Sequence, residues 1–359
     1  MSITYKGISW NPQKRKYDWI LAACCITYLT LFIGIKQADE PGESLDEAAI
    51  GATATLALIL IHTILCIGPL TRISKKFLPL LYNRRHLGVT AFLVAATHAT
   101  LVLVRIYSQK HVNPFLPLFT WGTAGHVMIA NFPFRPLGLF ALIILLFLAS
   151  TSHDFWMNTL GPKVWKSLHM LVYLAYLLIV LHVVLGVMQH KIEPVFLVIL
   201  LMGSTLLVTL HVSAGLREVR KDSRKYLTQK RGFVRVCRVT DIDRNRAKTF
   251  CIDKERIAVF RVENKLFAVH NICSHQQGPL GEGKVSDGCI ICPWHGYQYL
   301  PSSGKAPHPY KEKICTYDVK IEHGLVWINP KPFPAGTERP GAEIHQDDQW
   351  HSAWSGDAS

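Results

Sequence analysis

Two short pairs of cysteine and histidine are the most distinctive chemical feature of this sequence. Cys273 and His275 are separated by one residue, Cys292 and His295 by two, and sixteen residues lie between the pairs. Thiolate sulfur and imidazole nitrogen are strong ligands for iron and zinc. We therefore expect the four side chains to come from two loops and to hold a metal centre together.

Iron and zinc would use these ligands differently. In a Rieske [2Fe–2S] centre, two thiolates hold one iron and two imidazoles hold the other, which matches two Cys-His pairs. A zinc site would instead use Cys289, Cys292 and His295 as half of a tetrahedral set. Cys289 lies in a strand-like stretch, where alternation turns its side chain away from Cys292. The pattern therefore favours the iron–sulfur centre.

Residues 232–330 resemble a complete Rieske domain of the ferredoxin type. The resemblance rests on the two loops, on Gly278-Pro279-Leu280, on Gly304 and on Tyr317. Strand-like runs supply a β framework at Phe233–Val239, Ile257–Arg261, Leu266–His270, Val319–Ile321 and Leu325–Ile328. The resemblance implies a small all-β domain in which the two Cys-His pairs hold the cluster.

The loops also predict the reduction potential. Rieske proteins of quinol-oxidising complexes have an extra Cys in each loop and a Ser after the His-Gly. This sequence has Gly278, Trp294 and Tyr297 at those positions. Because fewer hydrogen bonds to the sulfurs lower the potential, we expect a value in the lower part of the Rieske range, near about −150 mV.

A second set of candidate ligands lies in apolar sequence. His62, His98, His169 and His182 fall inside runs of about 20 apolar residues, the length that spans a bilayer. An ionisable side chain in lipid is costly and indicates a functional site unless it only joins two helices. His169 and His182 are 13 residues apart, which is about 20 Å along a helix. They cannot bind one iron, although they could serve two stacked haems.

The apolar runs predict a bundle of six transmembrane helices and exclude a fully soluble protein. The predicted spans are Asp18–Ile35, Ala49–Gly68, Leu87–Tyr107, Pro136–Thr151, Val164–Met188 and Pro194–Val212. Lys and Arg gather before the first span, between the second and third, and after the sixth, whereas the loop after the first span is acidic. By the positive-inside rule, both termini face the cytoplasm. Lipid and topology therefore explain the net charge of +14 better than nucleic acid does.

The motifs in these spans resemble the ferric reductase-like transmembrane family over roughly residues 15–212. The resemblance rests on Arg84–Phe92 followed by His98, and on Gly161–Tyr173 followed by His182. The pattern is most similar to the branch that contains the haem subunit of the bacterial methionine sulfoxide reductase system. NADPH oxidases and iron reductases are more distant members.

This second resemblance implies b-type haem held by histidines of the third and fifth spans. Carried over to this sequence, His98 and His182 would hold an outer haem and His169 an inner one. The second inner ligand is open between His86, at the membrane edge, and His62, at a depth similar to that of His169. One haem and two haems are both compatible with the sequence.

These features divide the chain into five segments. They are a cytoplasmic N-terminal segment (1–17), the helical haem domain (18–212), a basic juxtamembrane linker (213–231), the Rieske domain (232–330) and a tail expected to be disordered (331–359).

The combination predicts electron transfer at a bacterial inner membrane. We expect an oxidoreductase component that passes electrons between a cytoplasmic Rieske cluster and haem b, towards a metal, a quinone or a periplasmic acceptor. No G-x-G-x-x-G motif follows a strand, so a separate cytoplasmic ferredoxin or flavin reductase would supply electrons. No soluble segment is left for the mononuclear iron of an oxygenase. The alternative is a membrane-anchored Rieske ferredoxin that serves another enzyme, with no haem conduit.

Overall fold

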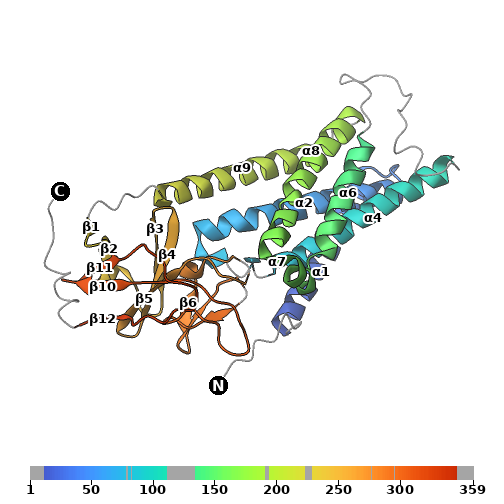
Figure 1. Ribbon diagram of the computed structural model, residues 1–359. Coiled ribbons are helices and arrows are strands. Elements are labelled where there is room, and N and C mark those ends of the chain that lie inside the picture. Colours follow the sequence, from blue (N-terminus) through green and yellow to red (C-terminus); the bar gives the residue numbers. More distant parts are fainter. Residues whose placement is uncertain are drawn as a thin grey trace, which may run out of the picture. The chain divides into compact units, whose positions relative to one another are not determined.

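The chain folds into two compact units, Met1–Val212 and Ser213–Ser359 (Figure 1). The computed structural model describes residues 12–77, 80–81, 83–110, 134–190, 194–222, 229–275, 277–294 and 296–345. The first unit is helical and the second is mostly β-structure. This division agrees with the predicted fold class.

The first unit contains long apolar helices. They are α1 (Pro12–Asp39), α2 (Leu45–Ile73), the 3-10 helix η1 (Lys75–Phe77), α4 (Arg84–Lys110), α6 (Arg135–Ser150), α7 (Asp154–His169), α8 (Leu171–His190) and α9 (Pro194–Asp222), whose last residues belong to the second unit. Among the described residues, five helical stretches are long and apolar enough to cross a membrane: Lys14–Asp39, Leu45–Ile73, Arg84–Ser108, Val164–Gly186 and Pro194–Arg220.

The predicted fourth span, Pro136–Thr151, is present as a helix but is shorter than the others, so the number of full-length spans is near six but not six. It corresponds to α6, which has 16 residues and is therefore about 24 Å long, against about 30 Å for the hydrocarbon core of a bilayer. The fifth predicted span, Val164–Met188, covers the end of α7 and most of α8, which meet at Met170, and its Val164–Gly186 portion is one of the five full-length stretches. The described part thus has five full-length spans and one short apolar helix.

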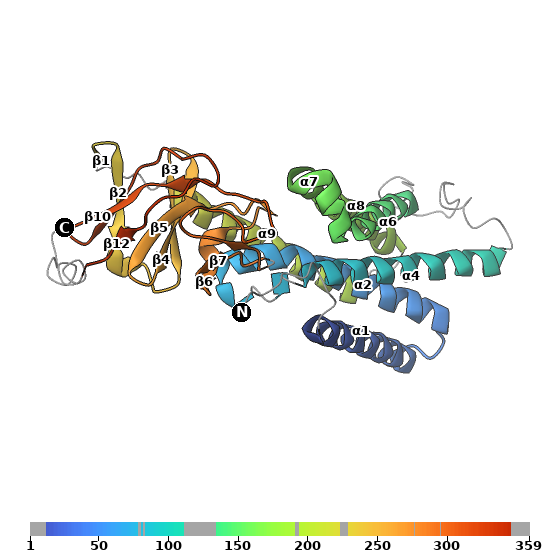
Figure 2. The same ribbon diagram turned by 60° about the horizontal axis from the view of Figure 1, so that its bottom comes forward.

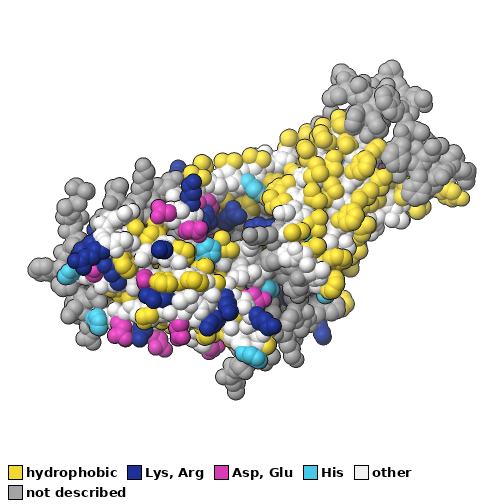
Figure 3. Space-filling model, in the orientation of Figure 1, with side chains coloured by type: hydrophobic (Ala, Val, Ile, Leu, Met, Phe, Trp, Pro, Cys, Tyr) yellow, Lys and Arg dark blue, Asp and Glu magenta, His cyan; other side chains and the backbone are white. Residues whose placement is uncertain are grey.

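Helix α2 forms the centre of the helical unit. It packs against both α1 and α4, which run beside it in Figures 1 and 2. Ile61 and Leu65 of α2 share a buried cluster with Ala175 of α8 and Leu200 of α9. The other helices expose large apolar side chains such as Phe147, and Figure 3 shows hydrophobic atoms over their visible face. An exposed apolar surface of this extent is stable in lipid.

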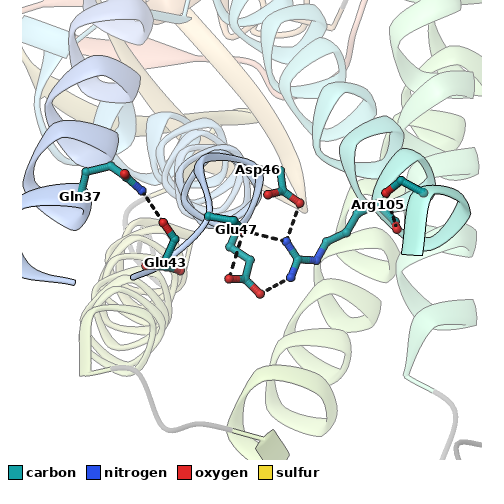
Figure 4. Close-up of polar contacts among 7 residues, drawn as sticks. Gln37, Glu43, Asp46, Glu47 and Arg105 are labelled. Atoms are coloured by element: carbon teal, nitrogen blue, oxygen red, sulfur yellow. Dashed lines mark hydrogen bonds and ion pairs between the residues drawn. The ribbon is translucent and has the colours of Figure 1, made fainter. Parts of the chain in front are cut away.

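A polar cluster joins the start of α2 to the end of α4. Arg105 of α4 donates a hydrogen bond of 3.1 Å to the hydroxyl of Ser44 and pairs with the carboxylates of Asp46 and Glu47 (Figure 4). Gln37 of α1 donates to the backbone carbonyl of Glu43 at 3.0 Å. The acidic connection after the first span therefore has a structural role, because it fixes the ends of three helices.

The second unit contains three small antiparallel sheets. Its strands are β1 (Gln229–Lys230), β2 (Phe233–Arg238), β3 (Ala247–Ile252), β4 (Glu255–Val262), β5 (Lys265–His270), β6 (Lys284–Ser286), β7 (Cys289–Ile291), β8 (Gln298–Tyr299), β9 (Thr316–Tyr317), β10 (Val319–Glu322), β11 (Leu325–Ile328) and β12 (Ala342–Glu343). The strand orders are β1-β2-β11-β10, β12-β5-β4-β3 with β9 beside β5, and β6-β7-β8.

The first two sheets share one hydrophobic core. Val234, Val259, Leu266 and Val326 are buried in it. Alternating apolar residues on strands place one face of each sheet against such a core. The five strand-like runs predicted from the sequence are confirmed as β2, β4, β5, β10 and β11.

The tail beyond residue 330 is ordered for much of its length, which corrects the prediction of disorder over 331–359. Strand β12 pairs with β5, and Ile344 is buried in the hydrophobic core. Arg339 forms an ion pair with Asp318. These contacts are made with strands distant in the sequence, so the local composition did not indicate them. Residues 346–359 lie outside the described part of the chain.

Candidate functional site

The two predicted metal-binding loops extend from strands of the second unit. The first follows β5 and the second connects β7 to β8. Each loop is closed by hydrogen bonds to its own cysteine: the Cys273 amide donates to the Gly278 carbonyl at 2.9 Å, and the Cys292 amide donates to the Tyr297 carbonyl at 2.8 Å. The Gly296 amide in turn donates to the Cys292 carbonyl at 3.0 Å. The backbone therefore holds both cysteines at the ends of tight turns.

The structure brings the two loops into contact at the cysteines. Cys273 and Cys292 are 0% and 2% exposed. A Cβ atom added to Gly278 of the first loop would lie 2.8 Å from the Sγ of Cys292 and 3.1 Å from the Trp294 ring. Only glycine therefore leaves room at this point, and two soft thiolate donors are shielded from water there. These donors and this space fit an iron–sulfur cluster.

Aromatic side chains surround the predicted ligands. The Tyr299 hydroxyl lies 3.4 Å from the Sγ of Cys273. The Tyr297 ring stacks on the imidazole of His275, with 4.7 Å between centroids and 13° between planes, and its hydroxyl donates to the carboxylate of Glu312. Burial raises the pKa of both phenols, so both are protonated donors.

The outcome for the four predicted cluster ligands differs from residue to residue. Cys273 and Cys292 come together, and His275 lies against the ring of Tyr297. His295 lies outside the described residues, and within the described ranges no group of three His, Cys, Asp or Glu side chains is arranged as a metal site. The complete set of four therefore stays a prediction.

The sequence alone does not indicate Glu312 or the roles of the two tyrosines. Tyr297 and Tyr299 follow the second Cys-His pair closely, so their proximity in sequence could have indicated them. Glu312 lies in a later loop and has no local signature. Its contact with Tyr297 is visible only in the folded unit.

Three histidines of the helical unit share one hydrogen-bonding pattern. The Nδ1 atoms of His98, His182 and His169 lie 3.2, 2.9 and 3.0 Å from backbone carbonyl oxygens of Ile50, Phe134 and Trp165, respectively. A carbonyl can only accept, so each Nδ1 carries the proton and each Nε2 keeps its lone pair. This tautomer is the one that binds a metal through Nε2.

The immediate surroundings of His169 and His182 add to this pattern. The Nε2 of His169 is buried and has no hydrogen-bond partner among the described residues, and its ring stacks on Trp165 at 3.8 Å. A Cβ atom at Gly138 of α6 would lie 2.9 Å from the His182 ring. An unpartnered buried nitrogen is expected where a metal completes the site, so His169 fits a haem ligand.

His62 has the same kind of contact at Nδ1 but differs from these three histidines at Nε2. Its Nδ1 donates to the Leu58 carbonyl at 2.8 Å, and its Nε2 accepts a hydrogen bond of 3.0 Å from Tyr176. The hydroxyl of Tyr176 also lies 2.8 Å from that of Ser204. These contacts join α2, α8 and α9, and they use the Nε2 lone pair that a metal would need.

His86 is the other candidate for the second inner ligand. It lies in the first turn of α4, and its Nδ1 is 2.8 Å and 3.0 Å from the two carboxylate oxygens of Asp18. Nδ1 therefore carries a proton, and Nε2 is the nitrogen available to a metal. Metal-binding histidines often have such a carboxylate behind them.

The chain matches two family models and several known proteins. Residues 232–318 match the Rieske [2Fe-2S] domain, and residues 48–180 match the ferric reductase like transmembrane component. The ferredoxin subunit of anthranilate 1,2-dioxygenase from Burkholderia cepacia is 40% identical over 74 residues, 20% of this chain and 68% of that protein. The solved ferredoxin of Sphingomonas yanoikuyae B1 is 30% identical, with 27% of this chain and 97% of that one covered and a TM-score of 0.25.

The helical unit is also similar to a haem protein. The heme-binding subunit of a protein-methionine-sulfoxide reductase from Agrobacterium fabrum is 36% identical over 158 residues, which are 44% of this chain and 64% of that protein. The chain thus spans slightly less than two thirds of this relative. The Rieske domain implies a [2Fe–2S] cluster, and the helical domain with its haem-binding relative implies haem b. The chain therefore belongs to the Rieske [2Fe–2S] family through its second unit, and it joins that domain to a ferric reductase-like transmembrane domain.

Proposed function

We propose that this chain passes electrons between a Rieske [2Fe–2S] cluster and b-type haem in the membrane. The observation that carries the proposal is the presence in one chain of two buried cysteines on touching loops and of three histidines with unprotonated Nε2 atoms. When bound, the cluster and the haem supply one-electron redox chemistry. The protein supplies ligands, orients them and keeps water away.

For the cluster, we assign Cys273 and Cys292 to one iron and His275 and His295 to the other. The two thiols are buried, and Gly278 keeps the space beside Cys292 open. The stack with Tyr297 holds the imidazole of His275 in one orientation. These contacts support the three assignments that fall on described residues.

For an outer haem, we assign His98 of α4 and His182 of α8. Their Nδ1 contacts come from carbonyls of two other segments, at Ile50 and Phe134. Each imidazole is therefore oriented by backbone, which keeps its Nε2 in place for an axial bond.

For an inner haem, we assign His169 and His86. Tyr176 already donates to the Nε2 of His62, which argues against that rival. Asp18 would orient His86 and strengthen its Nε2 as a donor. We therefore favour two haems over one.

The proposed direction runs from the cytoplasm outward. The clusters of Lys and Arg support an orientation with both termini in the cytoplasm of a bacterial cell. A soluble ferredoxin or flavin reductase would reduce the cluster, because the sequence carries no dinucleotide-binding motif. A quinone, a metal chelate or a periplasmic protein would then receive the electrons.

The test is the haem content of purified protein, measured from reduced-minus-oxidised spectra of the wild type, His98→Ala and His182→Ala. His211→Ala is the matched control, because its Nδ1 also contacts a backbone carbonyl, that of Leu207 at 2.9 Å, while its Nε2 accepts from Tyr173. We expect both ligand variants to lose haem and His211→Ala to keep it.

Two results would contradict this proposal. Equal haem in all four proteins would remove His98 and His182 as ligands. A Rieske signal with no haem in the wild type, after expression with ample haem, would instead support the membrane-anchored ferredoxin.

A further inference from the structure

The ring of Tyr297 has a single well-defined position beside the first loop. It is 3% exposed and lies parallel to the imidazole of His275. Tyr299 and Tyr310 pack against it, each with 5.3 Å between ring centroids. The orientation of the His275 ring is therefore coupled to that of Tyr297.

Glu312 determines where the hydroxyl of Tyr297 points. The phenol donates its only proton to the Glu312 carboxylate, which also accepts a hydrogen bond of 3.1 Å from the Lys311 amide. The backbone of Glu312 is fixed in turn, because its carbonyl accepts from the Ala306 amide at 2.9 Å. Tyr297 cannot donate to a cluster sulfur while this bond exists.

We propose that Glu312 is a positioning residue for the iron–sulfur cluster. Glu312 holds Tyr297 against His275, and the negative charge of Glu312 lowers the reduction potential of the cluster. This inference rests on the proposed function, because it takes Cys273, His275 and Cys292 as ligands. It adds a residue from a third loop, remote in sequence from both Cys-His pairs.

The direction in which Glu312 shifts the reduction potential follows from the charge that reduction adds to the cluster. The oxidised cluster gains one electron from an external donor, and the added negative charge is repelled by a nearby carboxylate. Such repulsion is stronger where protein excludes water, and Glu312 is half-buried. Reduction is therefore less favourable with Glu312 present, and neutralising Glu312 should raise the potential.

The experiment is a redox titration of the full-length protein in detergent, followed by electron paramagnetic resonance. Glu312→Gln removes the charge but keeps an oxygen that can accept from Tyr297. Tyr297→Phe keeps the aromatic ring and removes the hydroxyl that is hydrogen-bonded to Glu312. Glu343→Gln is the matched control, because Glu343 pairs with Lys265 at the start of β5, about 17 Å along the strand from its end near Cys273.

We expect Glu312→Gln to keep the Rieske signal with a higher midpoint potential, and Glu343→Gln to titrate like the wild type. We expect Tyr297→Phe to shift the g values, because the ring beside His275 is no longer tethered. An unshifted potential in Glu312→Gln would overturn the inference. If that variant fails to assemble a cluster, unchanged g values in Tyr297→Phe would overturn it.

The Rieske signal of the wild-type protein distinguishes a failure of this inference from a failure of the proposed function. A wild-type protein without a Rieske signal would overturn both. A wild-type signal with no response to Glu312→Gln would overturn the role of Glu312 alone.

Discussion

Two side chains near the predicted cluster act on its potential in opposite directions. Tyr299 can donate a hydrogen bond to the Sγ of Cys273, and donors to sulfur stabilise the reduced state. Glu312 adds negative charge, which disfavours that state. We therefore expect the potential of this Rieske domain to depend also on residues outside the two Cys-His pairs.

The first residue-scale prediction concerns Tyr299→Phe. We expect this variant to fold, because only a hydroxyl is removed, and to have a lower midpoint potential than the wild type. The change is opposite in sign to that of Glu312→Gln. Redox titration of both variants measures it, and a rise in potential for Tyr299→Phe would contradict the proposed hydrogen bond to sulfur.

The second residue-scale prediction compares the candidates for the inner haem. We expect His86→Ala and His169→Ala each to lose about half of the haem, on the expectation that a b-type haem needs two axial ligands. His62→Ala should keep the full amount, because its Nε2 already accepts from Tyr176. Haem per chain measures the difference, and loss of haem in His62→Ala alone would reverse the assignment.

The sequence predicts the candidate ligands better than it predicts their supporting contacts. The Cys-His pairs are recognisable because each is contiguous within a loop. The hydrogen bond between Tyr297 and Glu312 depends on the folding of a later loop against the cluster loops. The choice between His62 and His86 likewise depends on Tyr176 and Asp18, which lie on other helices.

At the scale of elements, close contact between α9 and α2 depends on a small residue. A Cβ atom at Gly203 of α9 would lie 2.7 Å from the His62 ring of α2. His62 is buried and held at both of its nitrogens. The ring therefore has little freedom to move aside.

This packing predicts that Gly203→Ala destabilises the helical unit by about 1–3 kcal/mol, the usual cost of overpacking. Gly215→Ala on the same helix is the control, because nothing lies within 4 Å of its added Cβ, and alanine is the better helix former by about 1 kcal/mol. Thermal unfolding in detergent compares the two. Equal melting temperatures would contradict the close contact at His62.

Local patterns predict the elements, whereas their ends and interruptions depend on contacts elsewhere. Short apolar runs were sufficient to predict β4 and β5, and the length of the apolar runs was sufficient to predict α2 and α9. The break between α7 and α8 has no proline to indicate it. The order of residues 331–345 comes from pairing of β12 with a distant strand, which local composition cannot indicate.

At the scale of the whole molecule, two redox domains lie in one polypeptide. Covalent linkage keeps the Rieske domain at the membrane, so it does not have to find the haem domain by diffusion. The proposed function would then depend on electron exchange between the two domains. Haem reduction should therefore require an intact cluster whenever the donor reacts only with the Rieske domain.

The most direct measurement of this claim is haem reduction by NADH and a soluble flavin-containing ferredoxin reductase, in wild type and Cys273→Ala. Dithionite, which reduces haem directly, serves as the control that both proteins contain haem. We predict rapid reduction of haem in the wild type, and oxidised haem in Cys273→Ala until dithionite is added. Equal rates of NADH-driven reduction in the two proteins would contradict electron transfer from the cluster to the haem.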